Sequence, residues 1–118
     1  MRYATLLSLL LIVTGDSIPS ARPNADLVEG NGLLEACTSR QAVPGAMCIG
    51  YIRGVIDGEN LMGTALNKKP FVCLSEGVTL GQVEEVVVKY LRENPAERNK
   101  PSAGLIGIAA ASAWPCAQ

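Results

Sequence analysis

The chain has 118 residues, a formal net charge of -1 and no histidine. This length fits one ordinary domain. The absence of histidine excludes a Ser-His-Asp or Cys-His hydrolase and any histidine-ligated zinc. From residue 26 onward, eight Lys and Arg stand against ten Asp and Glu, which disfavours a nucleic-acid partner. We therefore expect a single domain that is not an enzyme and needs no cofactor.

The first residues, 1–21, are predicted to be a secretory signal peptide. A positive start at Arg2 precedes an apolar run of about eleven residues from Tyr3 to Val13, and small and turn-forming residues follow. Cleavage is expected somewhere within 15–25, which leaves one domain over residues 26–118. The apolar run is shorter than the roughly 20 residues that span a membrane, so we expect export without stable membrane insertion.

Four cysteines, Cys37, Cys48, Cys73 and Cys116, follow the predicted signal peptide. An even number in a short exported chain indicates two disulfides. The gaps of 11, 25 and 43 residues are unlike the close pairs of structural zinc sites, so we expect no metal. A simple up-and-down bundle favours Cys37 with Cys48 and Cys73 with Cys116. The nested alternative, Cys48 with Cys73 and Cys37 with Cys116, stays open.

The first two predicted helices flank the break at Pro44. Residues 31–40 begin with Asn31, a good N-cap residue, and we expect the apolar face to consist of Leu33, Leu34 and Cys37. A second helix is predicted from about Gly45 through Asn60. Its apolar stripe consists of Cys48, Tyr51, Ile52, Val55 and Ile56.

Three glycines, Gly50, Gly54 and Gly58, recur every four residues on one face of the second predicted helix. Each costs about 1 kcal/mol relative to alanine, so some interaction must offset them. We expect close helix packing at this ridge. The partner is either another helix of the same subunit or a second copy of the chain at a dimer seam.

The segment from Leu61 to Gly77 is polar and broken and predicts a loop pinned by Cys73. A loop of this length in a small domain is either a contact surface for a partner or a tethered connector.

The plainest amphipathic helix follows this loop. Thr79 and Gln82 form a predicted capping box, and Asn94-Pro95 ends the helix. Its apolar residues fall at helical spacing: Val83, Val86, Val87, Tyr90 and Leu91.

A final helix is predicted from Pro101 to about Ala113, nearly all small or apolar and therefore buried. Its small residues Ala103, Gly107 and Ala111 are expected to pack against the glycine ridge of the second helix. The chain is thus predicted to be all-α, a small bundle of four helices or slightly more, with two disulfides.

The order of these motifs, over about residues 30 to 116, resembles the Rap/Tai immunity family. The resemblance rests on these motifs in order: a Leu-x-x-x-Cys helix from Leu33 to Cys37, Cys48-Ile49-Gly50-Tyr51-Ile52-x-Gly54-x-x-Asp57, Cys73-Leu74-x-x-Gly77-Val78-Thr79-x-x-Gln82, Val86-Val87-Val88-Lys89-Tyr90-Leu91-x-x-Asn94-Pro95, an Ala-rich helix, and Pro115-Cys116.

The resemblance implies a periplasmic protein, often a homodimer, that binds and inhibits a peptidoglycan amidase delivered by type VI secretion. Such a protein protects the producing cell from its own toxin and from the toxin that sibling cells deliver. Exposed mixed charge in and beside the predicted loop is suited to steer the toxin and set specificity. The residues that we expect to contact the toxin are Glu59, Asn60, Asn67, Lys68, Lys69 and Glu76.

A second hypothesis is a non-enzymatic periplasmic binding or envelope-stress protein of the same fold without a toxin partner. It would hold a ligand in an apolar groove, for which a dimer cleft lined by Tyr51 and Trp114 is one candidate. Catalysis is disfavoured, because Asp57 lies four residues after Arg53 and is better explained as half of a surface ion pair.

Overall fold

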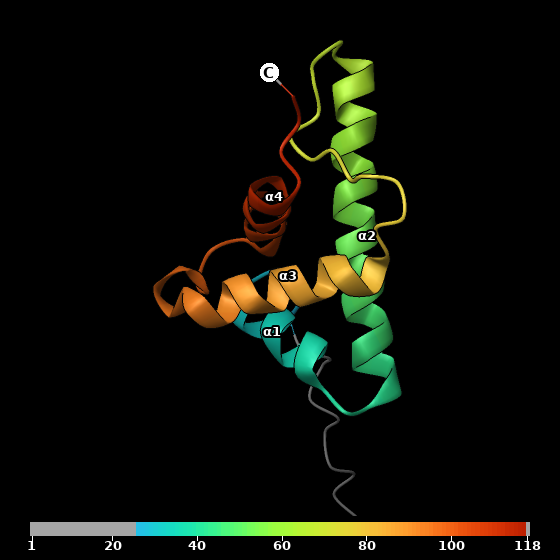
Figure 1. Ribbon diagram of the computed structural model, residues 1–118. Coiled ribbons are helices and arrows are strands. Elements are labelled where there is room, and N and C mark those ends of the chain that lie inside the picture. Colours follow the sequence, from blue (N-terminus) through green and yellow to red (C-terminus); the bar gives the residue numbers. More distant parts are fainter. Residues whose placement is uncertain (1–25, 118) are drawn as a thin grey trace, which may run out of the picture.

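The computed structural model describes residues 26–117, which fold into four α-helices without a β-strand (Figure 1). The elements are α1 (Gly30–Thr38), α2 (Ala42–Ala65), α3 (Leu80–Glu93), a short 3-10 turn η1 (Pro95–Glu97) and α4 (Ser102–Ala113). The predicted all-α fold is confirmed. The predicted signal peptide, residues 1–21, and its cleavage range lie outside the described residues.

The long helix α2 runs along one side of the molecule, and α3 crosses it near its middle (Figure 1). Contacts join α1 to α2, α3 to α4, α1 to α3 and α2 to α3, so every helix shares the core. The apolar stripes predicted for α2 and α3 point into this core. Its buried members are Leu33, Ala36, Cys48, Ile52, Ile56, Val72, Val83, Val87, Leu91, Leu105, Ile106, Ala109 and Ala110.

The N-terminus of α3 has the predicted capping box. The Gln82 backbone N–H donates to the Thr79 hydroxyl at 3.2 Å, and the Thr79 N–H donates to the Gln82 side chain at 2.8 Å. Two N–H groups at the start of the helix are thereby satisfied without water.

The start of α1 differs from the prediction, because Glu29 and not Asn31 is the N-cap residue. The first helical N–H groups donate to backbone carbonyls from the turn before α4: Gly30 to Lys100 at 3.2 Å and Asn31 to Arg98 at 2.9 Å. Tertiary contacts therefore replace the side-chain cap that the sequence pattern suggested.

Helix α2 is longer than predicted, and the following loop is correspondingly shorter. The helix continues to Ala65 and ends in a Schellman motif, in which the Lys68 N–H donates to the Gly63 carbonyl at 2.8 Å. Asn67 occupies the left-handed position of this motif with φ 50°. Asparagine tolerates that conformation better than most residues, which gives this turn a local cause.

Both disulfides join the cysteines that the simple bundle favoured. Cys37 pairs with Cys48 between α1 and α2, and Cys73 pairs with Cys116. The Cys73 N–H also donates to the Trp114 carbonyl at 3.0 Å, so the loop and the C-terminal segment are held together.

The expected close packing of the glycine ridge against another helix of the subunit is wrong. A Cβ atom built on Gly50, Gly54 or Gly58 would meet no atom within 4 Å. Helices α2 and α4 do touch, as predicted, but a side chain lies between their backbones. A Cβ on Gly107 would lie 2.6 Å from Glu59 Oε1.

The other small residues of α4 also depart from the expected ridge. Ala103 is exposed, and Ala111 is partly buried against the core. The dimer-seam alternative for Gly50, Gly54 and Gly58 stays a prediction. Among residues 26–117, every helix is too short or too polar to cross a membrane.

Candidate functional site

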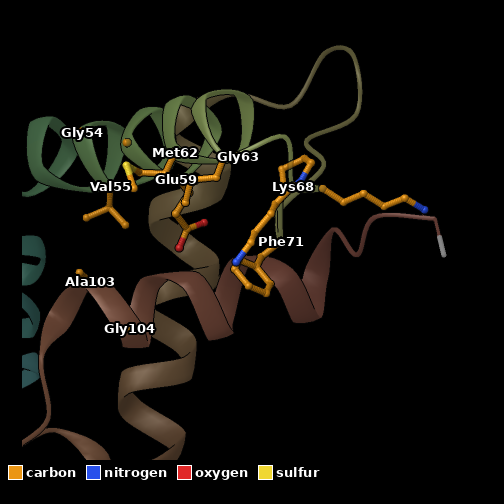
Figure 2. A pocket seen from close by; sticks show the side chains of 13 residues that line it. Gly54, Val55, Glu59, Met62, Gly63, Lys68, Phe71, Ala103 and Gly104 are labelled. Carbon is orange, nitrogen blue, oxygen red and sulfur yellow. The ribbon is translucent and has the colours of Figure 1, made fainter.

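A pocket of about 570 Å³ lies between the second half of α2, the loop that follows it and the start of α4 (Figure 2). Its lining residues are Gly54, Val55, Gly58, Glu59, Met62, Gly63, Leu66, Lys68, Lys69, Pro70, Phe71, Ala103 and Gly104. We call this the α2–α4 pocket. Its volume falls within the range usual for ligand sites in proteins.

Small residues keep the α2–α4 pocket open. Gly54 and Gly58 on α2, and Ala103 and Gly104 on α4, put little or no side chain into the space between the helices. The glycine ridge that the sequence predicted as a packing surface therefore borders a hollow instead.

Large apolar side chains form the outer wall of the pocket and remain in contact with solvent. Phe71 is 76% exposed, and Met62 and Leu66 are each 56% exposed. Apolar residues of this size that stay uncovered in a group mark a binding surface. We call residues 59–71, from the end of α2 through Phe71, the α2–loop corner.

The one acidic group of the pocket lining is Glu59. Its side chain points from α2 toward α4 (Figure 2), and its Oε2 is buried without a hydrogen-bond partner in the described part of the chain. Burial raises the pKa of this carboxyl above its ordinary value, because a charged carboxylate loses hydration there.

Most of the predicted contact residues gather at the α2–loop corner. Asn60, Asn67, Lys68 and Lys69 line a second, shallower hollow of about 480 Å³. Lys68 and Lys69 border both hollows, which links this surface to the α2–α4 pocket. Their role in contacting a toxin stays a prediction.

Three other residues of the sequence hypotheses lie elsewhere. Glu76 is exposed and lies outside both hollows. Trp114 lines a hollow of about 370 Å³ beside α3, whereas Tyr51 packs against the core, so the two do not form one groove within the subunit. The predicted Arg53–Asp57 ion pair is confirmed, with Nε 2.6 Å from Oδ2.

A second acidic group lies beside the first disulfide. Glu84 Oε1 is 3.6 Å from Cys48 Sγ, and the ligand atoms of Cys37, Cys48 and Glu84 lie within 4.8 Å of one another. Burial, and then the neighbouring Glu85, raise the pKa of Glu84. The two sulfurs are bonded to each other and lack the thiolate charge that binds a metal, so this cluster is no metal site in the oxidised protein.

Sequence reasoning missed the apolar half of the corner. Leu61, Met62, Leu66 and Phe71 were assigned to a polar loop. In the structure Leu61 and Met62 lie on α2, Leu66 caps its end, Phe71 follows in the loop, and all four are exposed. Four large apolar residues within eleven positions of a segment otherwise rich in Gly, Asn and Lys were the available signal.

Comparison with known proteins places the fold in a family. The family model of Rap1a immunity proteins matches residues 29–116, nearly all of the described chain. No curated protein and no solved structure matches the chain. The matched segment contains both disulfides and all four helices. The chain therefore belongs to the Rap1a immunity protein family.

Proposed function

We propose that this protein is exported to the periplasm, where it binds and inhibits a peptidoglycan amidase that type VI secretion delivers. The observation that carries the proposal is the family match over residues 29–116. An immunity protein of this kind acts by occupying its toxin and performs no chemistry itself. The absence of histidine from the sequence agrees with a non-enzymatic inhibitor.

The scaffold supports an inhibitory role, because it holds a protruding surface in a fixed position. The Cys73–Cys116 bridge ties the loop after α2 to the C-terminal segment, and the Schellman motif fixes the turn at Asn67. A surface held in advance loses little conformational entropy when it binds. The α2–loop corner therefore has the rigidity that tight inhibition needs.

The corner also combines the two kinds of residue that protein interfaces use. Its apolar members supply area that becomes buried, and its exposed lysines, Lys68 and Lys69, supply charge that steers a partner. We place the toxin contact on this corner, with Asn60 and Asn67 at its edge and Glu76 outside it.

We further propose that the protein forms a homodimer through the open glycine face of α2. Gly50 and Gly54 leave room for a helix of a second copy, and Val43 and Ile49 add exposed apolar surface on the same helix. Light scattering should give twice the monomer mass for the wild type and the monomer mass for Gly50→Leu. A folded Gly50→Leu protein that still dimerises would place the interface elsewhere.

The alternative is a periplasmic binding protein without a toxin, and the α2–α4 pocket is the observation that favours it. An apolar hollow of about 570 Å³ is large enough for a small ligand. Under this hypothesis the pocket binds its ligand within one subunit and not at a cleft between Tyr51 and Trp114.

Co-expression tests the proposed function. The protein, exported through its own leader, is produced with each candidate type VI amidase of the same genome, and the complex is captured from the periplasmic fraction. We expect one amidase to co-purify with the wild type and less of it with Lys68→Glu/Lys69→Glu. Lys89→Glu on the outer face of α3 is the matched control. Failure of the wild type to capture any amidase would favour the alternative.

A further inference from the structure

The Glu59 carboxylate has no hydrogen-bond or ion-pair partner among residues 26–117. Its Oε2 is buried without a hydrogen bond, and Oε1 lies against the α4 backbone, 2.6 Å from where a Cβ on Gly107 would be. Across residues 26–117, the ion pairs join Arg53 with Asp57, Lys89 with Glu93 and Lys100 with Glu97, and none includes Glu59.

A carboxylate with one buried and unpaired oxygen is unfavourable for the folded protein, because that oxygen loses hydration and no hydrogen bond replaces it. A hydrogen-bond donor that enters the pocket from another molecule would stabilise the carboxylate in place of the lost water. A cationic donor would restore most, because its charge adds Coulomb attraction to the hydrogen bond with the carboxylate. Burial raises the pKa of Glu59, as expected for a carboxyl group that has no positive charge beside it to compensate for lost hydration.

The surroundings of Glu59 indicate a protein ligand and not a small one. The walls next to it are apolar, with Val55 and Met62 on α2 and Phe71 on the loop, and all three surround the carboxylate in Figure 2. The apolar surface continues outside the pocket to Leu61, which is 68% exposed, and to the exposed face of Phe71. A small molecule inside the pocket would leave that outer surface uncovered, whereas a protein segment would cover both.

We propose that the α2–α4 pocket receives a basic side chain of the partner protein, whose ammonium or guanidinium group pairs with Glu59 while apolar neighbours of that side chain pack on Met62, Leu66 and Phe71. This inference rests on the proposed function, because the partner is the toxin. It adds a second mode of contact: the immunity protein accepts a side chain of the toxin as well as presenting its own loop.

Two lysines at the pocket set a further condition on the partner. Lys68 and Lys69 are exposed and line the same pocket, so their charges oppose the entry of a cation. Long, solvated lysine side chains can turn outward or pair with acidic groups of the partner. A basic residue with acidic neighbours therefore fits the pocket better than a run of basic residues.

The chemistry of the pocket is tested first without any toxin. Hexylguanidinium is titrated into the ¹⁵N-labelled protein, with hexanol and hexanoate as neutral and anionic probes. We expect saturable shifts at the amides of Val55, Met62 and Gly104 with hexylguanidinium, and an affinity at least about tenfold lower in Glu59→Gln. Asp57→Asn removes the same charge two residues away on α2, outside the pocket, and should bind like the wild type.

Three outcomes of the titration would overturn the inference. Hexanol could bind as tightly as hexylguanidinium, Glu59→Gln could leave the affinity unchanged, or the shifts could lie elsewhere. The double variant Lys68→Ala/Lys69→Ala should bind the cation equally or more tightly, because repulsion is removed. Loss of binding in this variant would also count against the inference.

Binding to an amidase that the protein inhibits tests whether the cation in the pocket is a basic side chain of the toxin. We expect Glu59→Gln to bind that amidase at least about tenfold more weakly than Asp57→Asn does. Equal binding would refute this inference and leave the proposed function intact. If the wild type binds no amidase but still binds hexylguanidinium through Glu59, the proposed function fails, and the partner-protein assignment of the pocket fails with it.

Discussion

The two halves of α2 carry similar residues into different surroundings. In the first half, Cys48 and Ile52 are buried among α1, α3 and α4. In the second half, Leu61 and Met62 lie on a helix that extends past α3, beside the loop (Figure 1), and both remain exposed. The buried residues of the first half stabilise the fold. Beyond the buried Ile56, the end of the second half leaves large apolar side chains in contact with solvent.

Removal of the disulfides should have the largest effect on the free energy of unfolding. Because one bridge lies at each half of α2, the two variants also compare these halves. Cys73→Ser/Cys116→Ser opens a loop of 43 residues beside the second half, whereas Cys37→Ser/Cys48→Ser opens one of 11 at the first half. Chain entropy predicts losses of about 4 and about 3 kcal/mol in the free energy of unfolding. Urea denaturation measures both. Equal or reversed losses would show that native packing, not loop length, determines the contribution of each bridge.

Truncation of one apolar residue in each half should separate the two roles. Ile52→Ala removes a buried side chain and should cost about 3 kcal/mol. Met62→Ala removes an exposed one and should change stability by less than about 0.5 kcal/mol, while weakening amidase binding. Urea denaturation and binding titration of both variants test this. A large loss of stability in Met62→Ala would mean that the second half is part of the core.

Glu59→Gln should stabilise the protein in a pH-dependent way. The folded pKa of Glu59 is raised, so its ionisation favours the unfolded chain, and the wild type loses stability as the pH rises from about 4.5 through the folded pKa. The variant lacks this loss. In thermal unfolding at pH 4 and pH 8, we expect the melting temperature of Glu59→Gln relative to that of the wild type to be higher at pH 8 than at pH 4.

The control for this pH dependence is Asp57→Asn, whose parent carboxylate pairs with Arg53 on the exposed face. It should not gain stability at pH 8. The charged groups nearest Glu59 are Lys68 and Lys69, which line its pocket. If they stabilised the Glu59 carboxylate in solution, Glu59→Gln would instead be the less stable protein at pH 8.

The smallest effect is expected at the glycine ridge. A Cβ on Gly50 has open space, so Gly50→Ala should gain about 0.8 kcal/mol from helix propensity in the monomer. Gly30→Ala is the contrasting variant, because its Cβ would lie 2.6 Å from Leu105 Cδ1 and 3.0 Å from the Arg98 backbone, and it should be destabilised. Thermal unfolding of the two variants should show a higher melting temperature for Gly50→Ala and a lower one for Gly30→Ala. Destabilisation of Gly50→Ala at dilutions where the protein is monomeric would contradict the open space at Gly50, whereas destabilisation only at concentrations that give the proposed dimer would support the dimer seam.

The sequence predicted the parts of the fold that short-range patterns determine. The capping box of Thr79 and Gln82 and the apolar spacing of α3 lie within fifteen residues, and both are confirmed. Of the two disulfide pairings that stayed open, the one favoured by a simple up-and-down bundle is confirmed. Such features depend little on how distant elements are arranged.

Features that depend on tertiary arrangement were not predictable in the same way. The N-terminus of α1 is capped by the Arg98 and Lys100 carbonyls, which come from a turn far along the chain. The glycine ridge was read as a packing surface, since periodicity gives the face on which Gly54 and Gly58 lie but not what stands opposite. The Glu59 side chain, and not a helix backbone, meets Gly107, and helical periodicity does not give such a tertiary contact.

The most direct test of the central claim is a titration of inhibition. A candidate type VI amidase is held at fixed concentration with purified peptidoglycan, and the release of cleaved peptide is measured as the protein is added. We predict complete inhibition near one equivalent for the wild type, and a clear loss of inhibition for the folded variant Lys68→Glu/Lys69→Glu. Undiminished cleavage by every amidase of the same genome, at any excess of the wild type, would contradict the account.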